Sequence, residues 1–355
     1  MNNDGEFIGR LADLSLGGRC LTREECLGVL DCADEKLMLL LHEAFKVRRE
    51  YFGKRVHVQV LRNAKSGLCS EDFRYCSQSS VSSAEIERYP LVTRETLIAE
   101  ARKALQIKAT RFCISASGAR PTDHEIDRLC GDINRIKEET GLPLCATLGL
   151  ISAAQAKKLK AAGLDRINHN LNTSRRYYPE VCTTHTFQDR LQTISLCQEE
   201  GLEICSGGIV GQGETDDDII DMLLTLRQIA PQAIPINFLI PIEGTPFGAL
   251  DGGLNPRRCL KILSLTRFLN PGSEVRAAGG WELHLKALKP LALYPADSVF
   301  VTGYLTTGGT SVAEVRDMIA DMGLESTIED TSAELDREKF EERSIHCGMK
   351  SSKRS

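Results

Sequence analysis

Cysteine is the residue type with the most evident chemistry in this 355-residue chain, which contains 13 of them. The number is odd, and the first residues, MNNDGEFIGR, lack the apolar core of a secretory signal peptide. Thiols stay reduced in the cytosol, so ligation of a metal or an iron–sulfur cluster explains some of these cysteines better than disulfides do. We therefore expect a cytoplasmic protein in which part of the cysteine set binds metal.

Two of the cysteines share one loop, which runs from Lys65 to Ser80. Cys69 and Cys76 are seven residues apart, and Tyr75 directly precedes the second of them. The loop follows a strand-like run at residues 56–62. Functional loops follow the strands of a parallel β/α barrel in this way, so the loop is a candidate for a cluster or metal site.

Composition excludes several other classes of protein. The net charge is −5, from 44 Lys and Arg against 49 Asp and Glu, and both signs are spread along the chain. This argues against nucleic-acid binding, which needs a basic face. No apolar run approaches the roughly 20 residues that span a bilayer. With 42% hydrophobic and 26% charged residues, we expect a soluble globular protein with no nucleic-acid or membrane partner.

The elements that must position the cysteines alternate regularly. After Tyr51, strand-like and helical runs repeat at a spacing of roughly 33 residues, which is typical of β/α units around a parallel sheet. Eight strands in strict alternation predict an α/β fold, a closed (β/α)₈ TIM-type barrel, rather than an open sheet. The expected strands are 56–62, 111–118, 143–149, 165–172, 203–210, 233–242, 274–280 and 298–306.

The chain divides into three expected regions. Residues 1–50 form an N-terminal helical extension, where Thr22 and Glu25 make a capping box before a leucine-rich run. Residues 51–325 form the barrel. Residues 326–355 are charged and weakly apolar, and form a short C-terminal tail.

The alternation of side chains along the strands indicates an unusual lumen. Cys113 and Cys145 each lie opposite the apolar positions of their strand, and Arg276 lies opposite Val275 and Ala277. The same alternation places Asn168, Asn170 and Asn172 together on the face opposite Ile167, His169 and Leu171, and separates Asn237 from its apolar neighbours. Buried polar groups are costly without partners, so we expect the lumen to hold a ligand, a cofactor or ordered water.

These motifs resemble those of one enzyme family. The loop from Lys65 to Ser80 is similar to the cluster loop of radical S-adenosylmethionine (SAM) enzymes, which reads Cys-x₃-Cys-x₂-Cys with an aromatic residue before the last cysteine. The phrases SGLC and YCSQSS are closer still to biotin synthase. The similarity covers about residues 51–323, through FCI, CATLG, NHNLNT, CSGGIVG and PINFL at the ends of the expected strands.

The resemblance implies that Cys69 and Cys76 hold a four-iron, four-sulfur (4Fe-4S) cluster. Phe73 stands where the family has its middle cysteine, and phenylalanine has no lone pair with which to bind iron. Asp72 or a water would have to fill the gap, although neither is a soft ligand. Two interpretations stay open: a degenerate copy that has lost the cluster, or a biotin synthase with an altered site.

The resemblance also implies a 2Fe-2S cluster inside the barrel, held by Cys113, Cys145, Cys205 and Arg276. The alternation of side chains along the strands independently places Cys113, Cys145 and Arg276 on the inward face. Cys69, Cys76 and Arg276 would be the catalytic residues. The expected ligand-binding residues are Tyr75, Asn170, Asn172, Gly207 and Gly208 for SAM, and Asn168 and Asn237 for dethiobiotin.

The implied reaction inserts sulfur into dethiobiotin and closes the thiophane ring of biotin, the last step of biotin biosynthesis. Dethiobiotin would be the small-molecule partner, and the resemblance further implies a flavodoxin-like electron donor and a homodimer. Trp281 departs from the family pattern, which usually has arginine after the paired glycines, so that an indole replaces a charge near the end of the barrel.

Two alternatives remain beside this interpretation. One is another radical SAM enzyme of the same barrel type, such as a maturase, against which the three cysteines and arginine argue. The other is a non-catalytic paralogue that binds a 2Fe-2S cluster, SAM or dethiobiotin as a sensor or scaffold, supported by Phe73 and Trp281. Cys182 and Cys347 have no predicted role.

Overall fold

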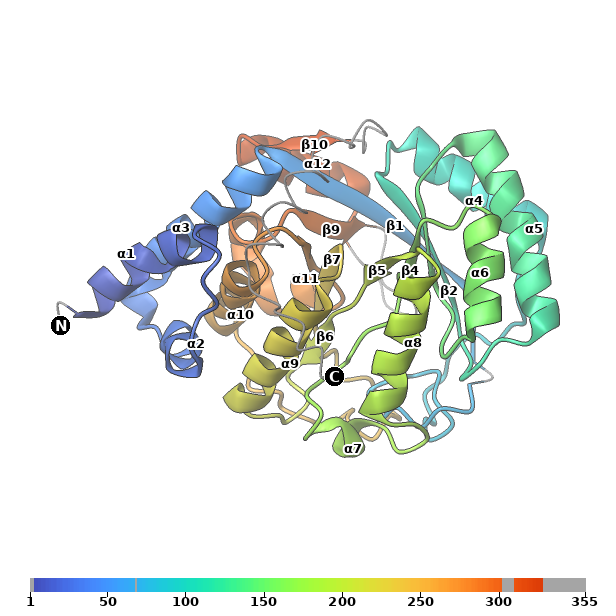
Figure 1. Cartoon of the computed structure of the whole chain (residues 1–355), viewed down its shortest axis with the longest axis horizontal. Helices are drawn as coiled ribbons and strands as arrows, with labels where there is room; N and C mark the ends of the chain where they lie inside the picture. The colour runs from blue at the N-terminus through green and yellow to red at the C-terminus, as the bar shows by residue number, and fades with distance from the viewer. Residues whose placement is uncertain (1–2, 68, 302–309, 328–355) are drawn as a thin grey trace, which may run out of the picture.

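The computed structural model describes residues 3–67, 69–301 and 310–327. Its centre is a ring of parallel strands surrounded by helices (Figure 1). Strand β1 pairs with β2 on one side and with β9 on the other, which closes the sheet. The predicted TIM-type barrel is therefore confirmed. The strands are β1 Arg55–Lys65, β2 Arg111–Ala116, β3 Leu144–Thr147, β4 Arg166–Asn168, β5 Glu203–Cys205, β6 Gly208–Val210, β7 Ala233–Phe238, β8 Glu274–Ala277 and β9 Ser298–Val301.

Two differences from the expected strands bear on the site. The run 203–210 is divided, because β5 pairs with β4 and both β5 and β6 pair with β7. The run 165–172 is a strand only as far as Asn168. Beyond that residue the strict alternation of faces no longer holds, and Asn172 has a positive φ of 69°.

The helices start where the sequence supplies caps. Thr22 and Glu25 form the predicted capping box at the start of α2, and Thr122 and Ser152 begin similar boxes at α5 and α6. The long helices of the barrel are α4 Arg94–Gln106, α5 Asp123–Thr140, α6 Ala153–Ala161, α8 Phe187–Glu199, α9 Asp216–Ile229 and α10 Pro256–Leu269. The shorter elements are α7 Tyr178–Val181, α11 Trp281–Leu285, the 3-10 helix η2 Lys286–Leu293 and α12 Val312–Asp321.

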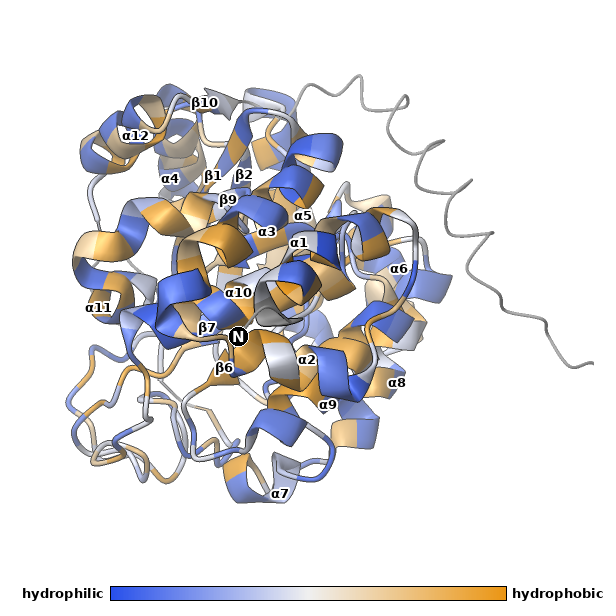
Figure 2. Cartoon of the chain, turned by 90° about the vertical axis from the view of Figure 1, so that its left-hand side faces the viewer, coloured by the Kyte–Doolittle hydropathy of each residue, from blue (hydrophilic) through white to orange (hydrophobic). Residues whose placement is uncertain are grey.

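The N-terminal region forms helices α1 Asn3–Leu16, α2 Arg23–Leu30 and α3 Leu37–Phe52, with the 3-10 turn η1 Asp34–Lys36. All three helices pack against α10, whose residues from Cys259 to Leu269 are buried. Figure 2 looks onto this side, with α1, α2 and α10 at the centre of the view. Buried Arg48 donates to the carbonyls of Gly53, Arg55 and Ala296, which ties α3 to the start of the barrel.

The C-terminal end of the described chain is strand β10, Glu325–Thr327, which pairs with β1. It includes the first residues of the expected tail; the remainder of that tail, with Cys347, lies outside the described residues, as does the expected end of the last strand at 302–306. None of the helices in the described part of the chain combines the length and apolarity that a membrane span requires.

Candidate active site

One cavity at the carboxyl ends of the strands joins the two groups of cysteines. It has a volume of about 250 Å³. Its wall includes Cys69 and Cys76 from the loop after β1, and Cys113, Cys145 and Arg276 from β2, β3 and β8. Residues that are up to about two hundred positions apart in the sequence thus face one space, which is where a TIM barrel places its active site.

The lumen cysteines meet because neighbouring strands are in register. Cys113 of β2 pairs with Cys145 of β3, and Cys205 of β5 pairs with Asn168 of β4. The three cysteines are 4%, 3% and 1% exposed. Hydrogen bonding to Cys113 raises the pKa of Cys145 to about 12. The same bond, together with the charge of Arg276, lowers the pKa of Cys113.

Arg276 approaches the thiols from β8. Its Nη1 lies 3.7 Å from Cys205 Sγ, its Nε donates to Ser298 Oγ at 3.0 Å, and its Nη2 donates to the Glu274 carboxylate. Its guanidinium carbon lies 4.7 Å from the centroid of the Phe300 ring. Burial disfavours the charge, but the Glu274 carboxylate and the thiols more than offset this and raise the pKa of Arg276.

A charged layer fills the barrel on the amino-terminal side of the cysteines. Arg111, Arg166, Glu203 and Glu274 are the first residues of β2, β4, β5 and β8. Arg166 Nη1 lies 2.9 Å from Glu274 Oε2, and Arg166 Nη2 lies 3.0 Å from Glu203 Oε2. Branched apolar side chains occupy these layers in an ordinary TIM barrel. Here the buried charges are paired, as buried charges must be.

The chemistry of this donor set fits a two-iron cluster. While Arg276 is protonated, it and the two arginines of the charged layer face two glutamates, which leaves one positive charge in excess that attracts the three thiolates. To bind iron, a nitrogen of Arg276 would have to give up its proton, because a guanidinium has no lone pair to offer. The residues that would hold the cluster are Cys113, Cys145, Cys205 and Arg276, the set that the resemblance implies.

The loop after β1 offers a poorer donor set. Cys69 and Cys76 both line the cavity, and burial raises the pKa of Cys76 to about 11. Between them Phe73 also faces the cavity, with its ring centroid 5.3 Å from that of Tyr75 and 5.4 Å from that of His185. An aromatic ring therefore occupies the position at which the resemblance implies a third ligand. The described loop does not fit a cluster that is held by three thiolates.

Asp72 is not available to fill this gap. Its carboxylate accepts backbone hydrogen bonds from Thr183 at 2.9 Å and from Thr184 at 3.2 Å. Burial opposes the charge, but these bonds hold the pKa of Asp72 well below its usual value. The side chain therefore cross-links the loop to residues 183–184, and it is not among the residues that line the cavity.

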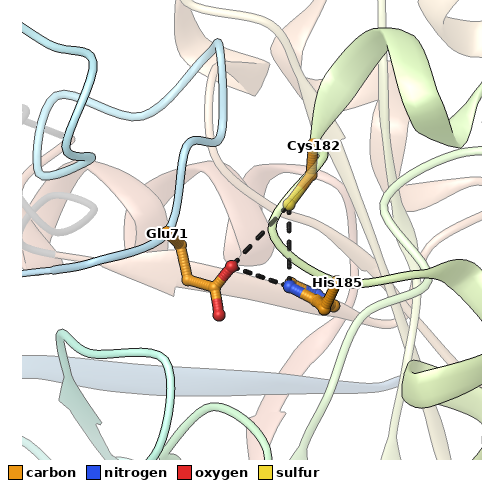
Figure 3. A group of neighbouring side chains, drawn as sticks. All are labelled: Glu71, Cys182 and His185. Atoms are coloured by element: carbon orange, nitrogen blue, oxygen red, sulfur yellow. Dashed lines mark hydrogen bonds and ion pairs between the residues drawn. The ribbon is translucent and has the colours of Figure 1, made fainter.

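A second cross-link is formed by Glu71, Cys182 and His185 (Figure 3), and the His185 ring contacts that of Phe73. His185 Nδ1 is 2.7 Å from Glu71 Oε2, and Cys182 Sγ is 3.6 Å from the same nitrogen and 3.8 Å from the same oxygen. Arg190 Nη1 lies 2.9 Å from His185 Nε2. Since a guanidinium can only donate, Nε2 accepts and Nδ1 carries the proton that is given to Glu71. Glu71, Cys182 and His185 thus form a hydrogen-bonded clamp on the loop after β1.

This clamp was missed in the sequence because Glu71 and His185 are 114 residues apart. Neither residue belongs to a metal-ligand spacing, and Cys182 had no predicted role. Glu71, His185 and Arg190 all line the cavity. The one signal in the sequence was the polar run CTTHT at residues 182–186, after a short helix. That run does not indicate that Glu71 is the partner of His185.

The expected asparagines lie around the thiols and the cavity. Asn168 Nδ2 donates to Cys205 Sγ at 3.1 Å, and Asn170 Oδ1 accepts from the backbone of Gly207 at 3.1 Å. Asn237 bridges two backbone segments, since Nδ2 donates to Gly208 O at 3.1 Å and Oδ1 accepts from Gly279 N at 2.9 Å. Each of the three side chains lines the cavity and has a protein partner.

Two buried polar atoms of the cavity wall lack a hydrogen-bond partner among the described residues. They are Asn172 Nδ2 and His169 Nε2, on side chains that are 2% and 1% exposed. Orphaned donors and acceptors of this kind fit a polar ligand such as SAM. The parity analysis was wrong to separate His169 from the asparagines, because β4 ends at Asn168.

The paired glycines do not line the cavity, although Ile209 next to them does. A Cβ at Gly207 would lie 1.9 Å from Pro235 O, and one at Gly208 would lie 2.0 Å from Met222 Sδ. Close packing of β5 and β6 against β7 and α9 thus explains both glycines without a ligand. Trp281 is likewise outside the cavity wall; it begins α11 and packs in the main apolar core.

Comparison with known proteins identifies the family. Residues 66–226 match the radical SAM superfamily, and residues 235–325 match the biotin and thiamin synthesis associated domain. The biotin synthase of Bacillus subtilis strain 168 is 46% identical over 326 residues, covering 92% of this chain and 97% of that protein. The biotin synthase of Geobacillus kaustophilus strain HTA426 is 47% identical over 315 residues, covering 89% and 94%.

Solved structures share the fold at lower identity. Methylornithine synthase has a TM-score of 0.79 at 21% identity, covering 94% of this chain and 99% of that one. The FeFe-hydrogenase maturase HydG from Carboxydothermus hydrogenoformans has a TM-score of 0.78 at 18% identity, covering 93% and 81%. The identity to the Bacillus and Geobacillus enzymes is higher and extends over about nine tenths of this chain. It shows that this chain belongs to the biotin synthase family of radical SAM enzymes, and this membership implies SAM and a 4Fe-4S cluster as cofactors.

Proposed function

We propose that this chain inserts sulfur into dethiobiotin to form biotin at the cavity described above. The observation that carries the proposal is the convergence of Cys113, Cys145, Cys205 and Arg276 at one point of the lumen, which is open to the same cavity as Cys69 and Cys76. We assign the first four residues to a 2Fe-2S cluster, which when bound would supply the sulfur atom. We assign Cys69 and Cys76 to the reducing site.

The remaining residues have positioning roles in this proposal. Asn172 and His169 offer unpartnered polar atoms to SAM, and Tyr75 offers an aromatic face on the same wall. Asn168 donates to Cys205, and Asn237 belongs to β7; both line the cavity, where dethiobiotin would come within reach of the lumen cysteines. The walls of the cavity limit the access of water from the covered sides, which protects reactive species and strengthens polar contacts.

Phe73 makes the reducing site the limiting part of the molecule. The lumen set is complete, whereas the loop has two thiols for the cluster that the family requires. We propose that electron delivery, rather than substrate binding or sulfur supply, sets the rate of turnover. A flavodoxin-like donor and a homodimer are further proposals that rest on the family alone. A cytoplasmic location and the division into regions 1–50, 51–325 and 326–355 are further proposals that rest on the sequence.

Anaerobic reconstitution with iron, sulfide and SAM tests the proposal. The wild-type chain and a Phe73→Cys variant are reduced in the presence of dethiobiotin, and 5′-deoxyadenosine, methionine and biotin are quantified. We expect biotin from both proteins, with a higher yield from the variant. If neither protein forms biotin while the 2Fe-2S absorption persists, the chain is a non-catalytic binder and the proposal is wrong.

A further inference from the structure

Glu274 is a buried carboxylate that is linked to a lumen cysteine through Gln59, and nothing in the expected ligand set gives it a role. It is 5% exposed and is the first residue of β8, two residues before Arg276. Because side chains alternate along a strand, residues 274 and 276 point to the same face. The carboxylate and the guanidinium therefore stand side by side within the barrel.

Three donors hold this carboxylate in one orientation. Gln59 Nε2 donates to Oε1 at 2.7 Å, Arg166 Nη1 donates to Oε2 at 2.9 Å, and Arg276 Nη2 also donates to Oε1. Arg166 is itself held by Glu203, through a 3.0 Å bond from its Nε. Glu274 thus cannot rotate without breaking bonds to three separate strands, β1, β4 and β8.

The same contacts decide which nitrogen of Arg276 faces the thiols. Glu274 occupies Nη2 and Ser298 occupies Nε, so Nη1 is the nitrogen directed at Cys205 Sγ. On the other side, the Cys113 thiol donates to Gln59 Oε1 at 3.5 Å, and Gln59 bonds to Glu274. One carboxylate therefore connects the arginine and, through Gln59, a cysteine on the opposite side of the site.

We propose that Glu274 is the positioning residue of the lumen cluster site, which fixes the Arg276 guanidinium with Nη1 turned towards the cysteines. The proposal deepens the proposed function and rests on the assignment of a 2Fe-2S cluster to this site. A flexible arginine would lose side-chain entropy on binding iron, and Glu274 removes this cost in advance. Nη1 would release one proton to solvent as its lone pair binds iron, while Nη2 keeps the proton that it donates to Glu274. Partners of metal ligands commonly change metal affinity about 10- to 100-fold when they are replaced.

The test isolates the lumen site and does not use biotin formation. In the full chain with Cys69→Ser and Cys76→Ser, the two loop thiols can no longer bind a cluster, and the lumen set is intact. A Glu274→Gln change keeps the size of the side chain and removes its charge. We expect the 2Fe-2S cluster to be lost to a chelator about tenfold faster than with Glu274 present. With ¹⁵N-arginine labelling, we expect the arginine hyperfine coupling of the dithionite-reduced cluster to weaken or disappear.

A matched control separates positioning from general stability. Asp297 and Arg267 form another fully buried carboxylate–arginine pair, and neither touches a lumen cysteine or Arg276. Asp297→Asn should also lower the melting temperature, because it leaves buried Arg267 uncompensated, as Glu274→Gln does for Arg166 and Arg276. It should leave the arginine coupling and the rate of cluster loss unchanged.

The outcomes are distinguishable. The proposal is overturned if Glu274→Gln keeps both the coupling and the rate of cluster loss, or if Asp297→Asn changes them equally. Should Glu274→Gln fail to fold, Glu274→Asp retains the charge on a shorter arm and is expected to show a smaller change in the same direction; an unchanged coupling would again refute the proposal. If the double-serine chain binds no cluster while Glu274 is intact, the lumen assignment itself fails.

Discussion

The two cysteine sites of this molecule share a cavity but are built differently. In the lumen, Cys113, Cys145 and Cys205 belong to strands whose register is set by the whole barrel. On the loop after β1, Cys69 and Cys76 depend on a short segment held by the clamp of Glu71 and His185. A strand-borne site is maintained by packing throughout the fold. A loop-borne site can lose a ligand at Phe73 while the fold remains intact.

The largest expected effect comes from breaking the lumen site. Cys205→Ser should abolish biotin formation and the 2Fe-2S absorption, because it removes a ligand from a set that has no replacement among its neighbours. Cys197→Ser is the matched control, since Cys197 is buried in the core on α8. Activity and visible spectra of the two variants give the answer; equal losses would contradict the lumen assignment.

Repair of the loop should give the next largest change. Phe73→Cys places a third thiol on the cavity wall, so the reconstituted variant should bind more iron than the wild type and form 5′-deoxyadenosine about tenfold faster or more. Iron analysis and chromatography measure both quantities. A variant that gains iron without faster SAM cleavage would show that electron transfer is not limited at this position.

Loosening the clamp should have a moderate effect that is confined to the loop. Glu71→Gln removes the charge that His185 and Thr184 hydrogen-bond, which costs about 1–3 kcal/mol in a buried site. Amide hydrogen exchange should rise in residues 69–80 and 182–186, while β2 and β3 stay protected. Exchange that rises equally in the strands would mean that the clamp stabilises the barrel rather than the loop.

The smallest effect concerns the start of α9, at the outer side of the barrel. Burial raises the pKa of Asp218, but bonds from Arg176, Ser174 and Thr215 more than offset this and lower it to about 2. A depressed pKa gives stability that is present above pH about 4 and is lost as pH falls towards 2. Asp218→Asn should therefore reduce the loss of unfolding free energy between about pH 4 and pH 2 by on the order of 1 kcal/mol, as measured by urea unfolding at several pH values.

Sequence reasoning succeeded where the backbone is regular. Cys113 and Cys145 lie in strands that keep strict alternation, so their placement at the cavity followed from parity. It failed at His169 because the chain leaves the β conformation after Asn168. The glycines at 207 and 208 resemble a ligand loop, yet the space they free is filled by Pro235 and Met222.

Contacts across long sequence separations account for the rest. Nothing local to Asp72 shows that its carboxylate is bound by the backbone of Thr183 and Thr184. The charged layer was equally hidden, because Arg166 and Glu274 are 108 residues apart and each reads as an ordinary strand end. Pairings of this kind appear only when the closed barrel brings the strands together.

The charged layer has a consequence for the supply of materials to the enzyme. Arg166, Glu203 and Glu274 pair with one another at the amino-terminal side of the cysteines, whereas the cavity that reaches the cysteines lies at the carboxyl ends of the strands, beside Tyr75 and the loop. Fresh iron and sulfide would then travel the same route as dethiobiotin and biotin. The sulfur-donating cluster could not be rebuilt while dethiobiotin or biotin occupies the cavity. Each molecule would therefore alternate between cluster assembly and biotin synthesis.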